Sequence, residues 1–162
     1  DCVLIQNYIR TTGLKCGAKA VDTMYTFPKE VSAVTKRSGK RVAPRGYITY
    51  KTPKLDEYGE VLTDKKGKPL TTENYCWLHS ACRATNKYSY KWYLAHCYDR
   101  FPNTAVNSYL TDYGYSIDRN VFALSEMLQW IWRSRIRKGE PIVLAIASNR
   151  MYNLFLDWLN KD

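Results

Sequence analysis

The chain has 162 residues, of which 45% are hydrophobic and 25% charged, a composition that fits one globular domain and excludes disordered and fibrous proteins. Its 25 Lys and Arg residues outnumber 15 Asp and Glu residues, and the formal net charge of +10 favours a polyanionic partner such as nucleic acid. No apolar run approaches the roughly 20 residues needed to cross a bilayer, and no secretory signal opens the chain. We therefore expect no membrane partner and a cytoplasmic location.

The five cysteines favour a reduced, intracellular setting, because their odd number and irregular spacing do not suit a disulfide framework. Five potential metal ligands lie close together in the sequence: Cys76, His79, Cys82, His96 and Cys97. No Cys-x2-Cys pair accompanies them, so we expect buried thiols and no bound metal. The alternative is a nuclease or zinc-dependent module built on this cluster.

The first half of the chain favours strands and basic loops. The apolar run at 2–9 predicts a buried strand, and a short helical stretch is expected at 17–22. Residues 28–75 are interpreted as a basic β-hairpin or loop insertion, in which 60–63 and 68–71 flank a turn at 64–67. The alternative for this insertion is a solvated surface hairpin without a partner. The residues expected to contact nucleic acid here are Lys36, Arg37, Lys40, Arg41, Arg45 and Lys51.

The second half predicts more helix. Helical spacing is found at 88–99, a helix is expected to start at Pro102 and end near Gly114, and a further one carries an apolar stripe of Leu124, Met127, Leu128 and Ile131. Residues 142–146 form an apolar run that suits a central strand covered on both faces. A final amphipathic helix follows, capped by Ser148. This order predicts an α/β layered fold in a single domain of residues 1–162.

A polar ridge is expected on the helix from about 125 to 138. Gln129, Arg133 and Arg137 recur at every fourth position, which places them on one face of a helix. Guanidinium groups match phosphates bidentately, and an exposed tryptophan offers a stacking face. The alternative is an ordinary solvated face. We expect nucleic-acid contacts from Trp130, Arg133, Arg135, Arg137 and Lys138, with Arg135 on the flank near Trp132.

Residues 124–139, Leu-Ser-Glu-Met-Leu-Gln-Trp-Ile-Trp-Arg-Ser-Arg-Ile-Arg-Lys-Gly, resemble motif VI of superfamily-two helicases. Over residues 82–160 the chain resembles the C-terminal part of DEAD/DEAH-type helicases of phages and mobile elements, with 83–88 in the place of motif V. The resemblance implies a RecA-like second lobe in which Gln129 and Arg133, together with Arg137 of the same ridge, reach nucleotide phosphates. Two positions depart from the motif, because Trp132 replaces its glycine and Ile136 replaces its last arginine.

The motifs of an ATPase active site are missing from the sequence. It contains neither a Gly-x-x-x-x-Gly-Lys-[Ser/Thr] phosphate loop nor an Asp-Glu-x-[His/Asp] motif for magnesium. We therefore expect no catalytic residues and no cofactor for this chain alone, and ATP only where a separate helicase lobe supplies the rest of the site.

The leading hypothesis is a nucleic-acid-binding protein that resembles a helicase second lobe, whose further partner would be a protein ATPase lobe. Because the chain begins with Asp1, we expect processing or a longer parent polypeptide. The alternative function is a small phage-encoded inhibitor of a host nucleic-acid enzyme, such as a CRISPR nuclease.

Overall fold

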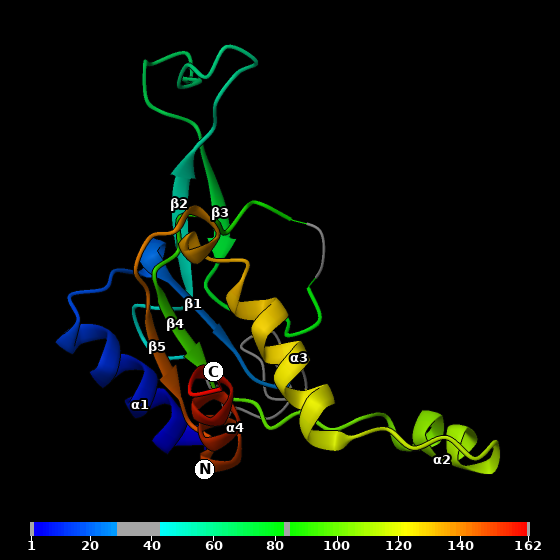
Figure 1. Cartoon of the computed structure of the whole chain (residues 1–162). Coiled ribbons are helices and arrows are strands. Elements are labelled where there is room, and N and C mark those ends of the chain that lie inside the picture. The colour runs from blue at the N-terminus through cyan, green and yellow to red at the C-terminus, as the bar shows by residue number, and fades with distance from the viewer. Residues whose placement is uncertain (1, 29–42, 83–84, 162) are drawn as a thin grey trace.

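A computed structural model describes residues 2–28, 43–82 and 85–161 (Figure 1). Three strands form a parallel sheet in the order β1-β4-β5, and two further strands, β2 and β3, form an antiparallel ribbon. The helices are α1 (Cys2–Lys15), α2 (Thr104–Asp112), α3 (Arg119–Ile131) and α4 (Asn149–Leu159), with short 3-10 helices η1 (Ala20–Asp22) and η3 (Arg135–Lys138). The strands are β1 (Thr23–Thr26), β2 (Thr49–Pro53), β3 (Thr71–Tyr75), β4 (Tyr93–His96) and β5 (Val143–Ile146).

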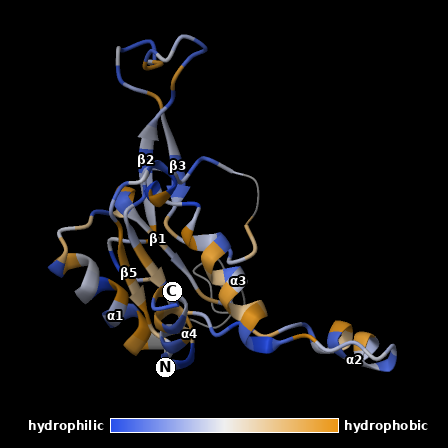
Figure 2. Cartoon of the chain, viewed as in Figure 1, coloured by the Kyte–Doolittle hydropathy of each residue, from blue (hydrophilic) through white to orange (hydrophobic). Residues whose placement is uncertain are grey.

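The parallel sheet separates two hydrophobic clusters, because successive side chains of a strand point to opposite faces. On one face, Tyr93 and Ala95 of β4 pack in a cluster with Ile9 of α1. On the other face, Leu94 lies in a cluster with Met127 of α3 and with residues of α4. Figure 2 shows hydrophobic residues along β5 and α3. The result is a three-layer α/β fold with a parallel sheet, as expected from the helix–strand–helix order.

Side-chain caps start α2, α3 and α4. The Asn103 side chain accepts a hydrogen bond from the backbone of Ala105, directly after Pro102. Asp118 caps α3 in the same way, and Ser148 caps α4 by accepting from Met151. Each cap satisfies backbone N–H groups that have no partner within the helix. The start of α4 at Ser148 is therefore confirmed, and α2 starts two residues after Pro102, whereas α3 starts at Arg119, six residues before the predicted start near 125.

Two predicted elements in the body of the fold are wrong. Residues 2–9 belong to helix α1, because Ile5, Tyr8 and Ile9 recur at helical spacing and pack in the cluster on the first face of the sheet. The stretch at 88–99 contains β4, whose four residues are all buried. Its apolar residues match helical spacing only by chance, because a short apolar run does not distinguish a helix from a buried strand. For the stretch at 17–22, the structure has only the single turn of η1 at its end.

The strand at 142–146 is confirmed, but its place in the sheet differs from the prediction. It forms β5, which lies at the edge, whereas β4 is central and pairs with both neighbours. Val143 is exposed and Ala145 is buried, as an edge strand allows. The long apolar run therefore predicted a strand correctly but did not predict its position at the edge of the sheet.

The β2–β3 ribbon projects away from the parallel sheet (Figure 1). The turn predicted at 64–67 is present: the Asp64 N–H donates to the Lys68 carbonyl at 2.8 Å, and Gly67 has a positive φ of 76°. Residues 45–75 contain six basic and five acidic side chains, so they carry little net charge. The basic excess expected of this insertion therefore comes from 29–42, which lies outside the described residues.

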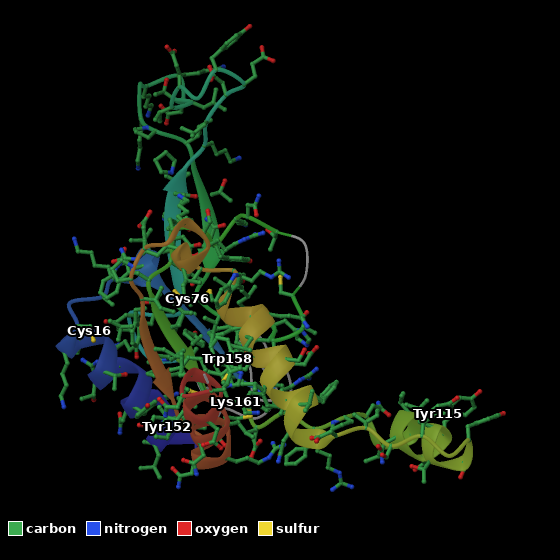
Figure 3. All side chains as sticks on the ribbon, in the orientation of Figure 1. Cys16, Cys76, Tyr115, Tyr152, Trp158 and Lys161 are labelled. Atoms are coloured by element: carbon green, nitrogen blue, oxygen red, sulfur yellow. The ribbon has the colours of Figure 1, made fainter. Side chains whose placement is uncertain are left out.

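Helix α2 forms an arm that extends away from the body of the molecule (Figure 1). None of its residues is buried. The rings of Tyr109 and Tyr113 contact each other at an interplanar angle of 47°, with centroids 4.9 Å apart, and Tyr115 lies on the same arm (Figure 3). The arm links β4 to α3, so it carries the chain from the sheet to the helix that bears most of the candidate site.

Candidate nucleic-acid interface

The helix predicted over 125–138 ends at Ile131, so the expected ridge does not lie on one helix. Buried Ser134 explains the break: its hydroxyl donates to the Ile131 carbonyl at 2.7 Å and also caps the following turn. Such side-chain bonds compete with the helical backbone. The chain then forms η3, which ends at Gly139, a residue with a positive φ of 72°.

The three predicted ligand-binding residues nevertheless meet at one pocket. Gln129 comes from the last turn of α3, Arg133 from the turn after it, and Arg137 from η3. The pocket has a volume of about 410 Å³. Its lining consists of Leu128, Gln129, Trp132, Arg133, Arg137 and Trp158. We call this set the arginine pocket. Figure 3 marks Trp158 on α4, beside α3.

The polar groups of the arginine pocket are only partly engaged by the protein. The Nε atom of Arg133 is buried and has no hydrogen-bond partner among the described residues. Arg137 is exposed, and its Nη1 donates to Oδ1 of Asn86 at 2.5 Å. Gln129 donates to the Ser125 hydroxyl at 3.2 Å. Within the described parts of the chain, neither arginine forms an ion pair with a carboxylate, so both charges are available to an anion.

Trp130 is not part of the candidate interface, contrary to prediction. It is fully buried, and its ring meets that of His96 edge-on, with centroids 5.5 Å apart. The reason is helical spacing, since Ala123, Met127 and Trp130 lie at i, i+4 and i+7 and share the core-facing side of α3. The neighbouring tryptophan, Trp132, is 46% exposed and lines the arginine pocket.

Arg135 has a largely structural environment. Its guanidinium lies over the ring of Trp92, with 5.5 Å from Cζ to the centroid. Its Nε donates to the Pro141 carbonyl at 2.5 Å. Lys138, on the same short helix, is exposed.

Two other predicted contacts that the structure describes do not line this pocket. Arg45 is exposed before β2, and Lys51 is exposed on β2 in register with Glu73 of β3. Four more predicted contacts lie outside the described residues: Lys36, Arg37, Lys40 and Arg41. Residues 83 and 84 of the expected motif V also lie outside them.

Three pocket residues were absent from the predicted site: Leu128, Trp132 and Trp158. Trp158 belongs to the amphipathic pattern of α4, and that pattern cannot show which aromatic side chain borders a pocket. Trp132 could have been found if the helix end at Ile131 had been predicted, because the break turns this side chain away from the core.

The carboxyl ends of the parallel strands, where open α/β sheets usually bind ligands, carry a second polar cluster. Arg150 of α4 pairs with Asp99 after β4, with 2.5 Å from Nη1 to Oδ1, and donates to Asn120 of α3 at 3.0 Å. Arg100 pairs with Glu126 at 2.9 Å. These groups bond mainly to one another, so the cluster fastens three elements together and leaves the arginine pocket as the better candidate site.

His96 ends the central strand beneath this cluster. It is fully buried, and neither ring nitrogen has a hydrogen-bond partner within the described residues. Burial, reinforced by the charge of Arg100, lowers the pKa of His96 from 6.5 to about 3. The imidazole is therefore neutral at neutral pH.

The structure describes the side chains of four cysteines, and two of these, Cys76 and Cys97, are buried. Burial raises the pKa of the Cys76 thiol to about 11 and that of Cys97 to about 12. Both are protonated at neutral pH. In the described parts of the chain, no group of three His, Cys, Asp or Glu side chains is placed to hold a metal ion. Nor does any helix there have the length and apolar character needed to span a membrane.

The parallel sheet and the helices on both of its faces define a Rossmann-like α/β domain. The chain belongs to the family described as the YonV C-terminal Rossmann-like domain, whose model matches residues 2–159.

A curated relative is the SPbeta prophage-derived uncharacterized protein YonV of Bacillus subtilis (strain 168). It is 48% identical over 121 residues, which cover 67% of this chain and 30% of the relative. The chain thus spans less than a third of the relative's length. This similarity supports the expected phage origin. No solved structure matches the chain.

Proposed function

We propose that the chain binds nucleic acid and that the arginine pocket contacts the phosphate backbone. The observation that supports this most is the convergence of Gln129, Arg133 and Arg137 on one pocket, although the chain between them changes direction at Ser134. Two guanidinium groups without carboxylate partners suit phosphate oxygens, which they can bind bidentately.

The charge of the molecule supports the same proposal. A net charge of +10 raises the local concentration of a polyanion around the protein. Lys138, next to Arg137, extends the positive charge beyond the pocket. The basic segment at 29–42 follows β1 in the sequence, and we propose it as a second region of backbone contact.

The resemblance of residues 124–139 to helicase motif VI leads to a finer proposal, namely that the domain is a relative of a helicase second lobe. In that case Gln129 and Arg133 would face a nucleotide, and the ATPase motifs would have to come from another part of a longer polypeptide or from a partner protein. The chain spans only 30% of its prophage relative, which leaves room for such a part in that protein.

The test is a fluorescence anisotropy titration with labelled single- and double-stranded DNA and RNA, with and without ATP, at low salt. We expect at least one of the four to bind. The double variant Arg133→Ala/Arg137→Ala should weaken that binding at least tenfold, because hydrogen bonds to charged groups contribute about 1.5–3 kcal/mol each.

The matched control is Arg10→Ala/Lys15→Ala, which removes the same charge from exposed positions of α1, on the opposite face of the sheet. This variant should bind almost as well as the wild type. Absence of binding to all four nucleic acids, or equal losses in the two double variants, would refute the proposed function.

A further inference from the structure

The arginine pocket has aromatic walls as well as charged groups. Trp132 and Trp158 line it together with Leu128, and the ring of Trp158 packs against Phe155 of the preceding turn at 5.8 Å between centroids. Phosphate binding explains the arginines but not the tryptophans, because a phosphate gains nothing from an apolar wall. Trp132 is 46% exposed, and its indole ring suits a flat, apolar ligand surface.

The size of the pocket limits what can enter. Its volume of about 410 Å³ lies at the lower end of the roughly 300–1,000 Å³ that is usual for small-molecule sites. The space therefore suits one nucleotide unit and not a segment of duplex. Gln129 adds an amide, which offers both a donor and an acceptor to the edge of a base.

We propose that the arginine pocket receives one unstacked base of a single-stranded nucleic acid. The base stacks on Trp132, and the phosphates next to it lie on Arg133 and Arg137. This inference rests on the proposed function and specifies its ligand. Bases in a duplex are stacked on their neighbours and cannot enter a pocket of this size without leaving the helix.

A free nucleotide has the same base and phosphate chemistry, but the surroundings of the pocket favour a strand. Arg137 and Lys138 both lie on η3 at the protein surface, where further phosphates of a chain can continue. A mononucleotide would use only the part of this charge that lines the pocket.

The experiment compares three DNA ligands on the wild-type protein at low salt, by fluorescence anisotropy: an intact single strand of ten bases, the same strand with abasic sites throughout its centre, and the corresponding duplex. Stacking of one base on an aromatic ring predicts that the abasic strand binds about 5- to 100-fold more weakly than the intact one. Trp132→Leu should weaken the intact strand by a similar factor and leave the abasic strand and the duplex nearly unchanged.

The matched control is Tyr152→Leu, which removes an exposed aromatic ring from α4 outside the pocket and should leave the affinities unchanged. Equal affinity for intact and abasic strands, or an equal loss for strand and duplex in Trp132→Leu, would overturn the inference while leaving the proposed function standing. Displacement of the strand by AMP or ATP at an equal concentration of nucleotide units would show a site for free nucleotides and would also overturn it. Absence of binding to every ligand would refute the proposed function itself.

Discussion

At the scale of single residues, two tryptophans two positions apart have opposite environments. Trp130 lies on the buried side of α3, against His96, whereas Trp132 lies after the end of the helix and borders the arginine pocket. Both sit among arginines in the sequence, and composition alone cannot separate them. Helical spacing could have separated them, because Trp130 follows Met127 by three positions and shares its core-facing side.

This difference predicts opposite effects of alanine substitution. Trp130→Ala should lower the free energy of unfolding by about 3–5 kcal/mol, because it leaves a large cavity in the core. Trp132→Ala should change it by no more than about 0.5 kcal/mol and act on ligand binding instead. Urea denaturation followed by circular dichroism measures both, and comparable losses of stability in the two variants would contradict these environments.

The buried imidazole of His96 predicts a loss of stability in mild acid. Its pKa is about 3 in the folded protein and about 6.5 when unfolded. Between these values the unfolded chain binds a proton that the folded chain does not, so the free energy of unfolding decreases as the pH falls below about 6.5, with a slope approaching about 1.4 kcal/mol per pH unit.

Urea titrations at several values between pH 5 and pH 7 measure that slope. His96→Gln should flatten it, whatever its effect on total stability. The control His79→Asn changes the exposed second histidine and should retain the slope of the wild type. An undiminished slope in His96→Gln would assign the acid sensitivity to other groups.

At the scale of elements, the helices with side-chain caps could be predicted and the sheet only in part. Local signals fix a cap such as Ser148, because the bonds that it makes lie within one turn. Strand β4 has four residues and depends on pairing with β1 and β5, which are distant in sequence. A short apolar run contains too little periodicity to distinguish such a strand from a turn of helix.

The contact between elements that we expect to matter most for stability is made by Arg150. Its guanidinium bonds Asp99 after β4, the backbone of Arg119, and Asn120 in the first turn of α3. Arg150→Met keeps much of the aliphatic part of the side chain and removes these bonds, so it should lower the free energy of unfolding by about 1–3 kcal/mol.

Arg10→Met on α1 is the control, because this arginine is exposed and should tolerate the change within about 0.5 kcal/mol. Thermal and urea unfolding of the two variants provide the comparison. Equal stability of Arg150→Met and the wild type would mean that the cluster at the carboxyl ends of the strands does not fasten α4 to its neighbours.

At the scale of the whole molecule, the α/β class followed from the order of helix, apolar strand and amphipathic helix in the second half of the chain. The predicted ligand residues Gln129, Arg133 and Arg137 do meet, but through a helix end and a turn rather than along one helix. Trp158 joins them from α4, and no local pattern could show this, because the contact depends on how α3 and α4 pack on the sheet.

We have proposed that Arg133 and Arg137 bind phosphates. The dependence of binding on salt concentration tests this, measured with single-stranded DNA for the wild type, for Arg133→Ala/Arg137→Ala and for the control Arg10→Ala/Lys15→Ala. Each phosphate contact on a single strand contributes about 0.7 to the slope of log affinity against log salt concentration. We predict that the arginine variant loses about 1.4 from this slope and that the α1 control retains it. An unchanged slope in the arginine variant would contradict phosphate binding at this pocket.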